Sequence, residues 1–114
     1  MPWFKVDDNL ALHAKVLTAG NGAMGLWVRA GAWSMQQLTD GFVPNAIAAT
    51  LGTKGEAGRL VSAGLWDQKD DGYQFHEWEQ RQPSRVQLHA ERDAAAERKR
   101  KSRERRESEK RGVR

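Results

Sequence analysis

Apolar side chains recur with a helical period along one long segment of the chain. Between Ala23 and Gln37 they stand three or four positions apart, at Met24, Leu26, Trp27, Ala30 and Trp33, with Ser34 on the same face. Side chains at this spacing share one face of a helix. The pattern therefore predicts a mostly buried helix over residues 23–37.

The segment before this helix combines strand-favouring residues with a helix start. The run from Trp3 to Val6 is rich in residues that favour a strand, and the Asp7-Asp8-Asn9 run that follows is typical of a helix N-cap. We expect a short helix there whose apolar positions are Leu10, Val16 and Leu17. The sequence Ala-Gly-Asn-Gly at residues 19–22 should separate it from the next helix.

Two further helices are predicted between residues 44 and 64. Thr39-Asp40-Gly41 indicates a turn and Phe42-Val43 a two-residue strand, after which Pro44 suits the first position of a helix. The inner face of that helix is formed by Ala46, Ile47 and Leu51, and it ends at Gly52. Thr53 and Glu56 then have the spacing of a capping box, which starts a new helix.

The helix after Thr53 has an apolar side and a polar side. Ala57, Leu60, Val61 and Gly64 are expected to face inward. The positions left toward solvent are Lys54, Gly55, Gly58, Arg59, Ser62 and Ala63. This side is open because two of its positions are glycine, and it carries two cations.

A hairpin is predicted after these helices. Residues 65–69 and 73–78 are two strand-like runs around Asp70-Asp71-Gly72, and we expect Gly72 to supply the positive φ of a tight turn. Four tryptophans lie in these apolar patterns, and we interpret them as core residues rather than as a platform for base stacking: Trp27, Trp33, Trp66 and Trp78.

The last third of the chain differs in composition from the rest. Residues 1–80 hold six basic and nine acidic side chains, a net charge of −3, whereas residues 81–114 hold thirteen and six, a net charge of +7. Ser84 and Gln87 form a second capping-box pattern, which predicts a solvated helix to about Lys110 with opposite charges four residues apart. We therefore expect a folded domain over residues 1–82 and a basic, helical or partly disordered tail over residues 83–114.

The predicted order of elements indicates a fold and a function. Helix, short strand, helix, tight turn, helix and hairpin is the order in a winged helix-turn-helix domain, an α+β and mostly α fold in which the helix after the turn enters a DNA groove. We expect double-stranded DNA to be bound by the exposed side of the helix over about residues 54–64 and by the tail. In the hairpin, Asp67, Asp70 and Asp71 oppose phosphate contact, and Lys69 and Gln68 are its only candidates. The candidate residues are Thr53, Lys54, Gly55, Arg59, Ser62, Lys69, Arg98, Lys99, Arg100, Lys101, Arg103, Arg105 and Arg106.

Other chemistry has little support. The chain has no cysteine, and its three histidines have no second histidine at ligand spacing. On a strand, His76 and Glu77 would point to opposite faces rather than converge on a metal. No nucleophile elbow or phosphate loop is present. We expect no enzyme activity, no cofactor, no metal and no membrane segment.

Several stretches resemble a known group of proteins. They are MPWFKVDD, GLWVRAGAW, LTDGFVP, LVSAGLW and GYQFHEWEQRQPSR, followed by an Ala/Glu/Arg tail. Together they resemble small helix-turn-helix proteins of actinobacterial phages and prophages, and the segment GYQFHEWEQ is similar to the winged N-terminal domains of phage replication-initiation and replisome-organiser proteins. The resemblance implies DNA binding in a bacterial cytoplasm, in replication initiation or transcriptional regulation.

A second function class stays open. Winged domains also bind proteins, and the net charge of −3 over residues 1–80 is unusual for a strong DNA surface. This alternative predicts a host, phage or replication protein as partner. The DNA sequence recognised and the oligomeric state are not predicted by any pattern in the chain.

Overall fold

The structure is a computed structural model that describes residues 3–112. It divides into two compact units, residues 1–82 and residues 83–114, at the boundary where the composition changes. The first unit is a small α+β body, and the second consists of one long helix.

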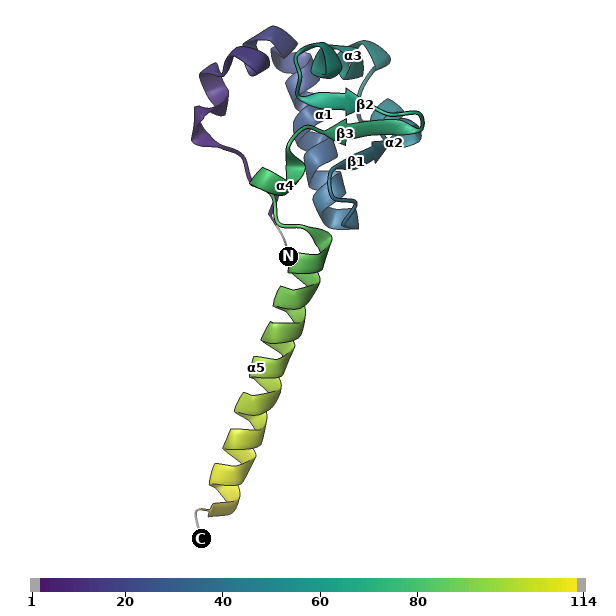
Figure 1. The fold of residues 1–114 in the computed structure, drawn as a ribbon. Coiled ribbons are helices and arrows are strands. Elements are labelled where there is room, and N and C mark those ends of the chain that lie inside the picture. Colours follow the sequence, from purple (N-terminus) through teal and green to yellow (C-terminus); the bar gives the residue numbers. More distant parts are fainter. Residues whose placement is uncertain (1–2, 113–114) are drawn as a thin grey trace. The chain divides into compact units, whose positions relative to one another are not determined.

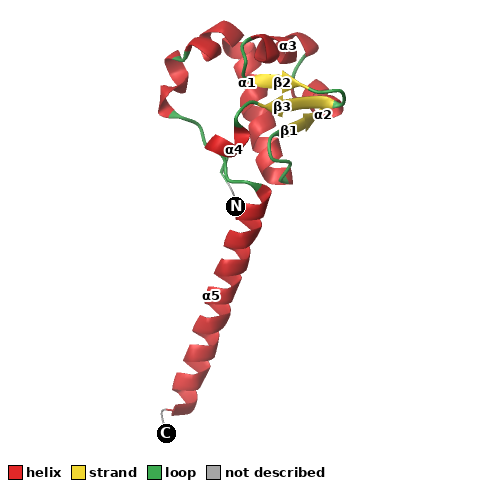
Figure 2. Cartoon of the chain, viewed as in Figure 1, coloured by secondary structure: helices red, strands yellow, loops and turns green. Residues whose placement is uncertain are grey.

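The first unit packs helices around a small sheet. Its elements are η1 (Asp8–Leu12), α1 (Ala14–Gln37), β1 (Phe42–Pro44), α2 (Asn45–Leu51), α3 (Lys54–Ser62), β2 (Trp66–Gln68), β3 (Gly72–Phe75) and α4 (Trp78–Arg81). The three strands form an antiparallel sheet in the order β1-β3-β2. Figure 1 shows α1 running behind the sheet, and Figure 2 shows how helices surround the three strands.

The core joins α1, α3 and the sheet. Leu26, Leu60, Val43 and Trp66 are fully or almost fully buried, which confirms the expected inner positions of the two helices and of the hairpin. Trp78 is also buried, whereas Trp27 and Trp33 are half-buried. All four tryptophans therefore have at least part of their surface covered by the body.

The predicted break in the first helical region is confirmed, but the helix before it is not as expected. Gly20 has φ 84° and ψ 166°, so the helical path is interrupted there. The expected first helix is itself divided, because η1 ends at Leu12 and α1 begins with His13 as its N-cap. Leu17 is 64% exposed and does not belong to an inner face.

The strand-favouring residues Trp3–Val6 form no strand, because this segment is held by side chains instead of by a neighbouring strand. The backbone N–H of Lys5 donates to Gln82 Oε1 at 2.9 Å, and Gln82 Nε2 donates to the carbonyl of Lys5 at 2.6 Å. The Phe4 ring packs edge-on against Trp27, with ring centroids 5.1 Å apart. One buried glutamine thus satisfies both backbone groups that a ladder would have used.

The hairpin is present, but Gly72 serves a different purpose from the one expected. Its φ is not positive, and it is the first residue of β3. A Cβ at this position would stand 2.3 Å from the carbonyl oxygen of Val43 in β1. Glycine is required here because the paired backbone of β1 lies so close, so the prediction of a positive φ was wrong.

The second hairpin strand is shorter than predicted. β3 ends at Phe75, and Glu77 adopts a left-handed conformation with φ 59° before α4 begins at Trp78.

The start of α2 also differs from the expected one. Pro44 pairs with Gly72 in the sheet and caps α2, so α2 begins one residue later than expected. Of the predicted inner face of α2, Ile47 and Leu51 are half-buried, Ala46 is exposed, and the buried residue is Ala48.

The second unit is the helix α5 (Arg85–Gly112). Its start confirms the predicted capping box: the N–H of Gln87 donates to Ser84 Oγ at 3.1 Å, and the N–H of Ser84 donates to Gln87 Oε1 at 2.8 Å. Every side chain from residue 89 to residue 110 is exposed. The predicted extent of this helix is therefore confirmed.

Candidate nucleic-acid interface

The helix α3 begins with a complete capping box. The N–H of Glu56 donates to Thr53 Oγ1 at 3.1 Å, and the N–H of Thr53 donates to Glu56 Oε1 at 2.8 Å. The Glu56 carboxylate is also surrounded by two glycines, because a Cβ on Gly22 or Gly52 would stand 2.8 or 3.0 Å from its oxygens. The single acid of α3 is therefore turned toward α1 and the α2–α3 turn.

The outward side of α3 has the composition that the sequence predicted. Lys54, Gly55, Gly58, Arg59 and Ser62 are all exposed, whereas Ala57 and Leu60 are buried. At 3.6 residues per turn the five exposed positions fall within an arc of about 140°. This open face carries two cations and one hydroxyl, and no carboxylate stands on it.

No contact around Gly55 and Gly58 explains why these two positions of the face are glycine. A Cβ at Gly58 would meet nothing within 4 Å, and one at Gly55 would meet only Thr53 Oγ1, at 3.9 Å. Neither residue has a positive φ. Glycine inside a helix costs about 0.5–1 kcal/mol relative to alanine. The body gains nothing in return from the missing side chains.

Two cations that the sequence analysis missed lie beside this helix pair. Arg29 of α1 donates from Nη1 to the carbonyl oxygen of Leu51 at 2.9 Å, at the end of α2. Lys15 places Nζ 3.5 Å from the carbonyl oxygen of Gly64, just beyond α3. These partners are 22 and 49 residues apart in the chain, so no local pattern could have indicated them.

The charges of the first unit are unevenly distributed. Four of the six cations in residues 1–80 lie near α2 and α3. Lys54 and Arg59 belong to α3, Arg29 contacts the carbonyl of Leu51 at the end of α2, and Lys15 contacts the carbonyl of Gly64 just beyond α3. Of the nine acids, only Glu56 belongs to α2 or α3. The net charge of −3 therefore does not describe the α3 face, which is basic.

The hairpin tip is a less favourable surface for DNA than the α3 face. Lys69 is exposed at the tip between β2 and β3, where its N–H donates to the carbonyl of Gly72 at 2.8 Å. Its neighbours Asp70 and Asp71 are exposed as well. Two carboxylates beside one ammonium make this tip a poor surface for phosphate.

The candidate residues of the tail lie on α5 and differ in their surroundings. Arg100 is engaged by two carboxylates, with Glu97 through Nε and Nη2 and with Glu104 through Nη1 at 3.2 Å. The hydrogen bond that Arg100 donates to Glu97 and, second, the charge of Glu104 raise the pKa of the Arg100 guanidinium. Arg100 is thus the least available of the predicted tail contacts. The other candidates are exposed: Arg98, Lys99, Lys101, Arg103, Arg105 and Arg106.

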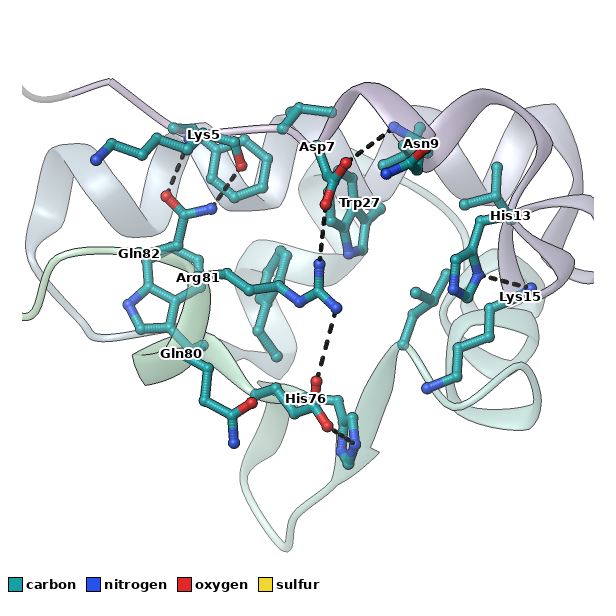
Figure 3. Close-up of a pocket in the computed structure, with 18 of the residues that line it drawn as sticks. Lys5, Asp7, Asn9, His13, Lys15, Trp27, His76, Gln80, Arg81 and Gln82 are labelled. Atoms are coloured by element: carbon teal, nitrogen blue, oxygen red, sulfur yellow. Dashed lines mark hydrogen bonds and ion pairs between the residues drawn. The ribbon is translucent and has the colours of Figure 1, made fainter.

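A cavity of about 650 Å³ lies between the N-terminal segment and the sheet. Apolar and aromatic side chains, among them Trp27, Phe75 and Leu65, form part of its wall. Figure 3 shows the polar groups at its edge, where Arg81 bridges two carboxylates, with Asp7 at 3.7 Å and Glu77 at 3.8 Å. These side chains connect the N-terminal segment to α4.

The polar groups of this cavity have structural partners. Asp7 accepts the N–H of Asn9 at 2.9 Å, and this backbone hydrogen bond is the main reason that the pKa of the Asp7 carboxyl lies below its ordinary value. His13 Nδ1 accepts the N–H of Lys15 at 3.2 Å and caps α1. Asp7 and His13 thus each stabilise the local backbone structure.

The expected divergence of His76 and Glu77 is wrong. His76 Nδ1 lies 3.3 Å from Asp67 Oδ2, and Nε2 lies 3.5 Å from Glu77 Oε1. The two residues approach each other because the strand ends at Phe75 and the left-handed Glu77 turns the chain. Within residues 3–112 no three His, Cys, Asp or Glu side chains are grouped so that they could hold a metal ion.

No helix within the described part of the chain is long and apolar enough to cross a bilayer. Comparison with family models, with curated proteins and with solved structures finds no match to this chain.

Proposed function

We propose that the first unit is a winged helix-turn-helix domain that binds double-stranded DNA through the exposed face of α3. In this proposal α2 and α3 are the helix-turn-helix pair, and the β2–β3 hairpin is the wing. The order of the elements and the antiparallel sheet support this assignment. A role in phage or prophage replication initiation or transcriptional regulation follows from the resemblance of the sequence.

The observation that carries the proposal is the pair of glycines on the α3 face. Gly55 and Gly58 are exposed, have ordinary φ values and have open space around them. Both reduce the intrinsic stability of the helix without any compensating contact in the body. A groove that must approach the helix backbone closely would account for them, because any side chain would hold the helix away from it.

The chemistry of the remaining positions fits the same partner. Lys54 stands at the first turn of α3, where the free N–H groups and its ammonium suit a phosphate oxygen. Arg59 is long enough to reach the O6 and N7 acceptors of a guanine in the major groove. Arg29 extends the basic surface past the α2–α3 turn.

A substitution series at Gly58 tests the proposal. Gly58→Ala and Gly58→Gln should raise or preserve the melting temperature and weaken binding to duplex DNA in order of size, as measured by fluorescence anisotropy. Ala11→Gln, at an exposed position of η1, is the control for added bulk and should leave binding unchanged. Unchanged affinity in Gly58→Gln would refute contact through the α3 face.

The specificity of Arg59 needs a separate experiment. Arg59→Ala should reduce discrimination between duplex sequences more than total affinity, by about 1–3 kcal/mol at the recognised base. Lys5→Ala removes one positive charge from the N-terminal segment and serves as the matched control. A loss of equal size on every sequence would make Arg59 a phosphate contact.

A second function, binding of a protein partner, is favoured by a different surface. Within residues 3–112, four of the six large hydrophobic side chains that are strongly exposed belong to the N-terminal region: Trp3, Val6, Leu12 and Leu17. Exposed apolar residues that cluster are typical of interaction surfaces. A pull-down that survives nuclease treatment and is lost in Trp3→Ser with Leu12→Ser would support this function, and nuclease-sensitive capture would oppose it.

A further inference from the structure

The charges of α5 are sorted by face. With 3.6 residues per turn, five cations of residues 92–110 fall within an arc of about 60° that contains no acid among residues 85–110. We call them the basic stripe: Arg92, Lys99, Arg103, Arg106 and Lys110. All five side chains are exposed. The stripe thus holds five of the ten cations of residues 85–110, whereas Arg98, Lys101 and Arg105 lie on a different face.

Four of the six acids of α5 gather on another face, and Glu91 and Glu109 lie outside it. Asp93, Glu97, Glu104 and Glu107 fall within an arc of about 80° that begins beside the basic stripe and extends around the helix. Arg100 lies in the middle of this arc and is held by Glu97 and Glu104. The one cation of the acidic face is thus neutralised by its neighbours, which sharpens the separation between the two faces.

This separation is not needed for helix stability. Ion pairs between residues three or four apart stabilise a solvated helix by about 0.2–0.5 kcal/mol each, and they form wherever opposite charges alternate. A helix selected only for such pairs would mix both signs on every face. The basic stripe instead places cations beside cations, for example Arg103 beside Lys99 and Arg106, which is unfavourable in the absence of a polyanion.

We infer that α5 binds the DNA backbone lengthwise through the basic stripe, with its acidic face turned away from the phosphates. From Arg92 to Lys110 the stripe extends for about 27 Å at 1.5 Å per residue. That length corresponds to about eight base pairs at 3.4 Å each. This inference rests on the proposed function and assigns the tail contacts to one face, with Lys99, Arg103 and Arg106 central and Arg100 excluded.

An anionic membrane is a less suitable partner for this helix. Helices that lie on a membrane bury an apolar face that contains Trp, Phe or Leu. Past Leu88, alanine is the most apolar residue of α5 up to Lys110, and alanines contribute little area. The basic stripe therefore has the charge but not the apolar face that a membrane surface requires.

A rearrangement of charges at constant composition tests the inference. Glu97→Lys with Lys99→Glu, and Glu104→Arg with Arg106→Glu, move two cations from the basic stripe to the acidic face without changing the net charge. The exchange removes the two ion pairs of Arg100, and the new carboxylates stand four residues before Arg103 and Lys110, where they can form replacement pairs. The matched control keeps every sign in place: Glu97→Asp, Lys99→Arg, Glu104→Asp and Arg106→Lys. Circular dichroism verifies equal helicity in both full-length variants.

The readout is binding to a short labelled DNA duplex between about 50 and 200 mM salt. The rearranged variant should show a slope of log K against log salt that is shallower by about 2, because two phosphate contacts are lost. The control should keep the parent slope. Equal slopes in all three proteins would overturn the face assignment while leaving the α3 proposal intact, whereas no binding by the parent would overturn both. Stronger competition by anionic phospholipid vesicles than by unlabelled duplex would also overturn the inference.

Discussion

The ring of Phe4 lies directly against the backbone of Gly31. A Cβ on Gly31 would stand 2.3 Å from Phe4 Cζ, which is far inside any normal contact. The same ring stacks on Trp78 with centroids 5.9 Å apart and meets Phe75 edge-on at 5.9 Å. Phe4 is thus the residue by which the N-terminal segment enters the aromatic core, and Gly31 leaves the space for it.

Gly31→Ala should displace Phe4 and destabilise the body. Forcing a methyl group into a filled core costs about 1–3 kcal/mol, which exceeds the gain in helix propensity. Gly25→Ala is the matched control in the same helix, because a Cβ there would meet nothing within 4 Å, and it should add about 0.5–1 kcal/mol. Urea unfolding followed by tryptophan fluorescence measures both. Equal stability of the two variants would contradict this account of Phe4.

Gly72→Ala should weaken the pairing of β1 with β3. The new Cβ would meet the Val43 carbonyl oxygen at 2.3 Å, and that oxygen belongs to the backbone and cannot rotate away. We expect the free energy of unfolding to fall by about 2 kcal/mol or more. If thermal unfolding instead shows a stabilised protein, the close approach of the two strands is wrong.

Arg29→Ala should affect stability and DNA binding together. The carbonyl oxygen of Leu51 would lose its side-chain partner, which costs about 0.5–1.5 kcal/mol at this exposed site. In the DNA-binding proposal the salt slope should also fall by about 1, with equal losses on all sequences. Titrations on two unrelated duplexes measure this, and sequence-selective loss would instead place Arg29 at a base.

The Asp7 carboxylate makes stability depend on acid pH. Its pKa is lowered in the folded protein from 3.8, chiefly by the Asn9 N–H, so the stabilisation is complete above that value and is lost as pH falls through the folded pKa. The difference in melting temperature between parent and Asp7→Ala should therefore be largest near neutral pH and shrink as the pH falls below 3.8. A difference that does not change with pH would exclude the carboxylate charge as its cause.

Local patterns were sufficient for the helices and the hairpin, because their determinants are close in sequence. The Thr53 and Glu56 box, the start of α5 at Ser84 and the inward Leu60 each depend on neighbours within a few residues. The bounds of α2, α3 and α5 were predicted to within about two residues, whereas β3 ends three residues earlier than the predicted strand and the first expected helix is divided. The exposed α3 face follows from the same periodicity, so its residues were predicted together.

The features that the sequence did not predict depend on contacts between distant segments. Residues 3–6 have strand propensity, but the partner that holds Lys5 is the Gln82 side chain, 77 residues away. Gly72 was assigned to a turn because its neighbours are turn residues, whereas its real constraint is the backbone of β1. Arg29 and Lys15 join the basic surface only because the fold carries α1 past the ends of α2 and α3.

The interruption at Gly20 sets how the N-terminal region can open. Its φ of 84° and ψ of 166° are accessible almost only to glycine, and a Cβ there would touch nothing, so the backbone alone creates the joint. Residues 8–19 connect Gly20 to the segment that Phe4 and Lys5 fix to the body through Trp27 and Gln82. Their amide protons should therefore exchange with solvent in one cooperative step, faster than those of α1 beyond Ala23 and without unfolding of the sheet.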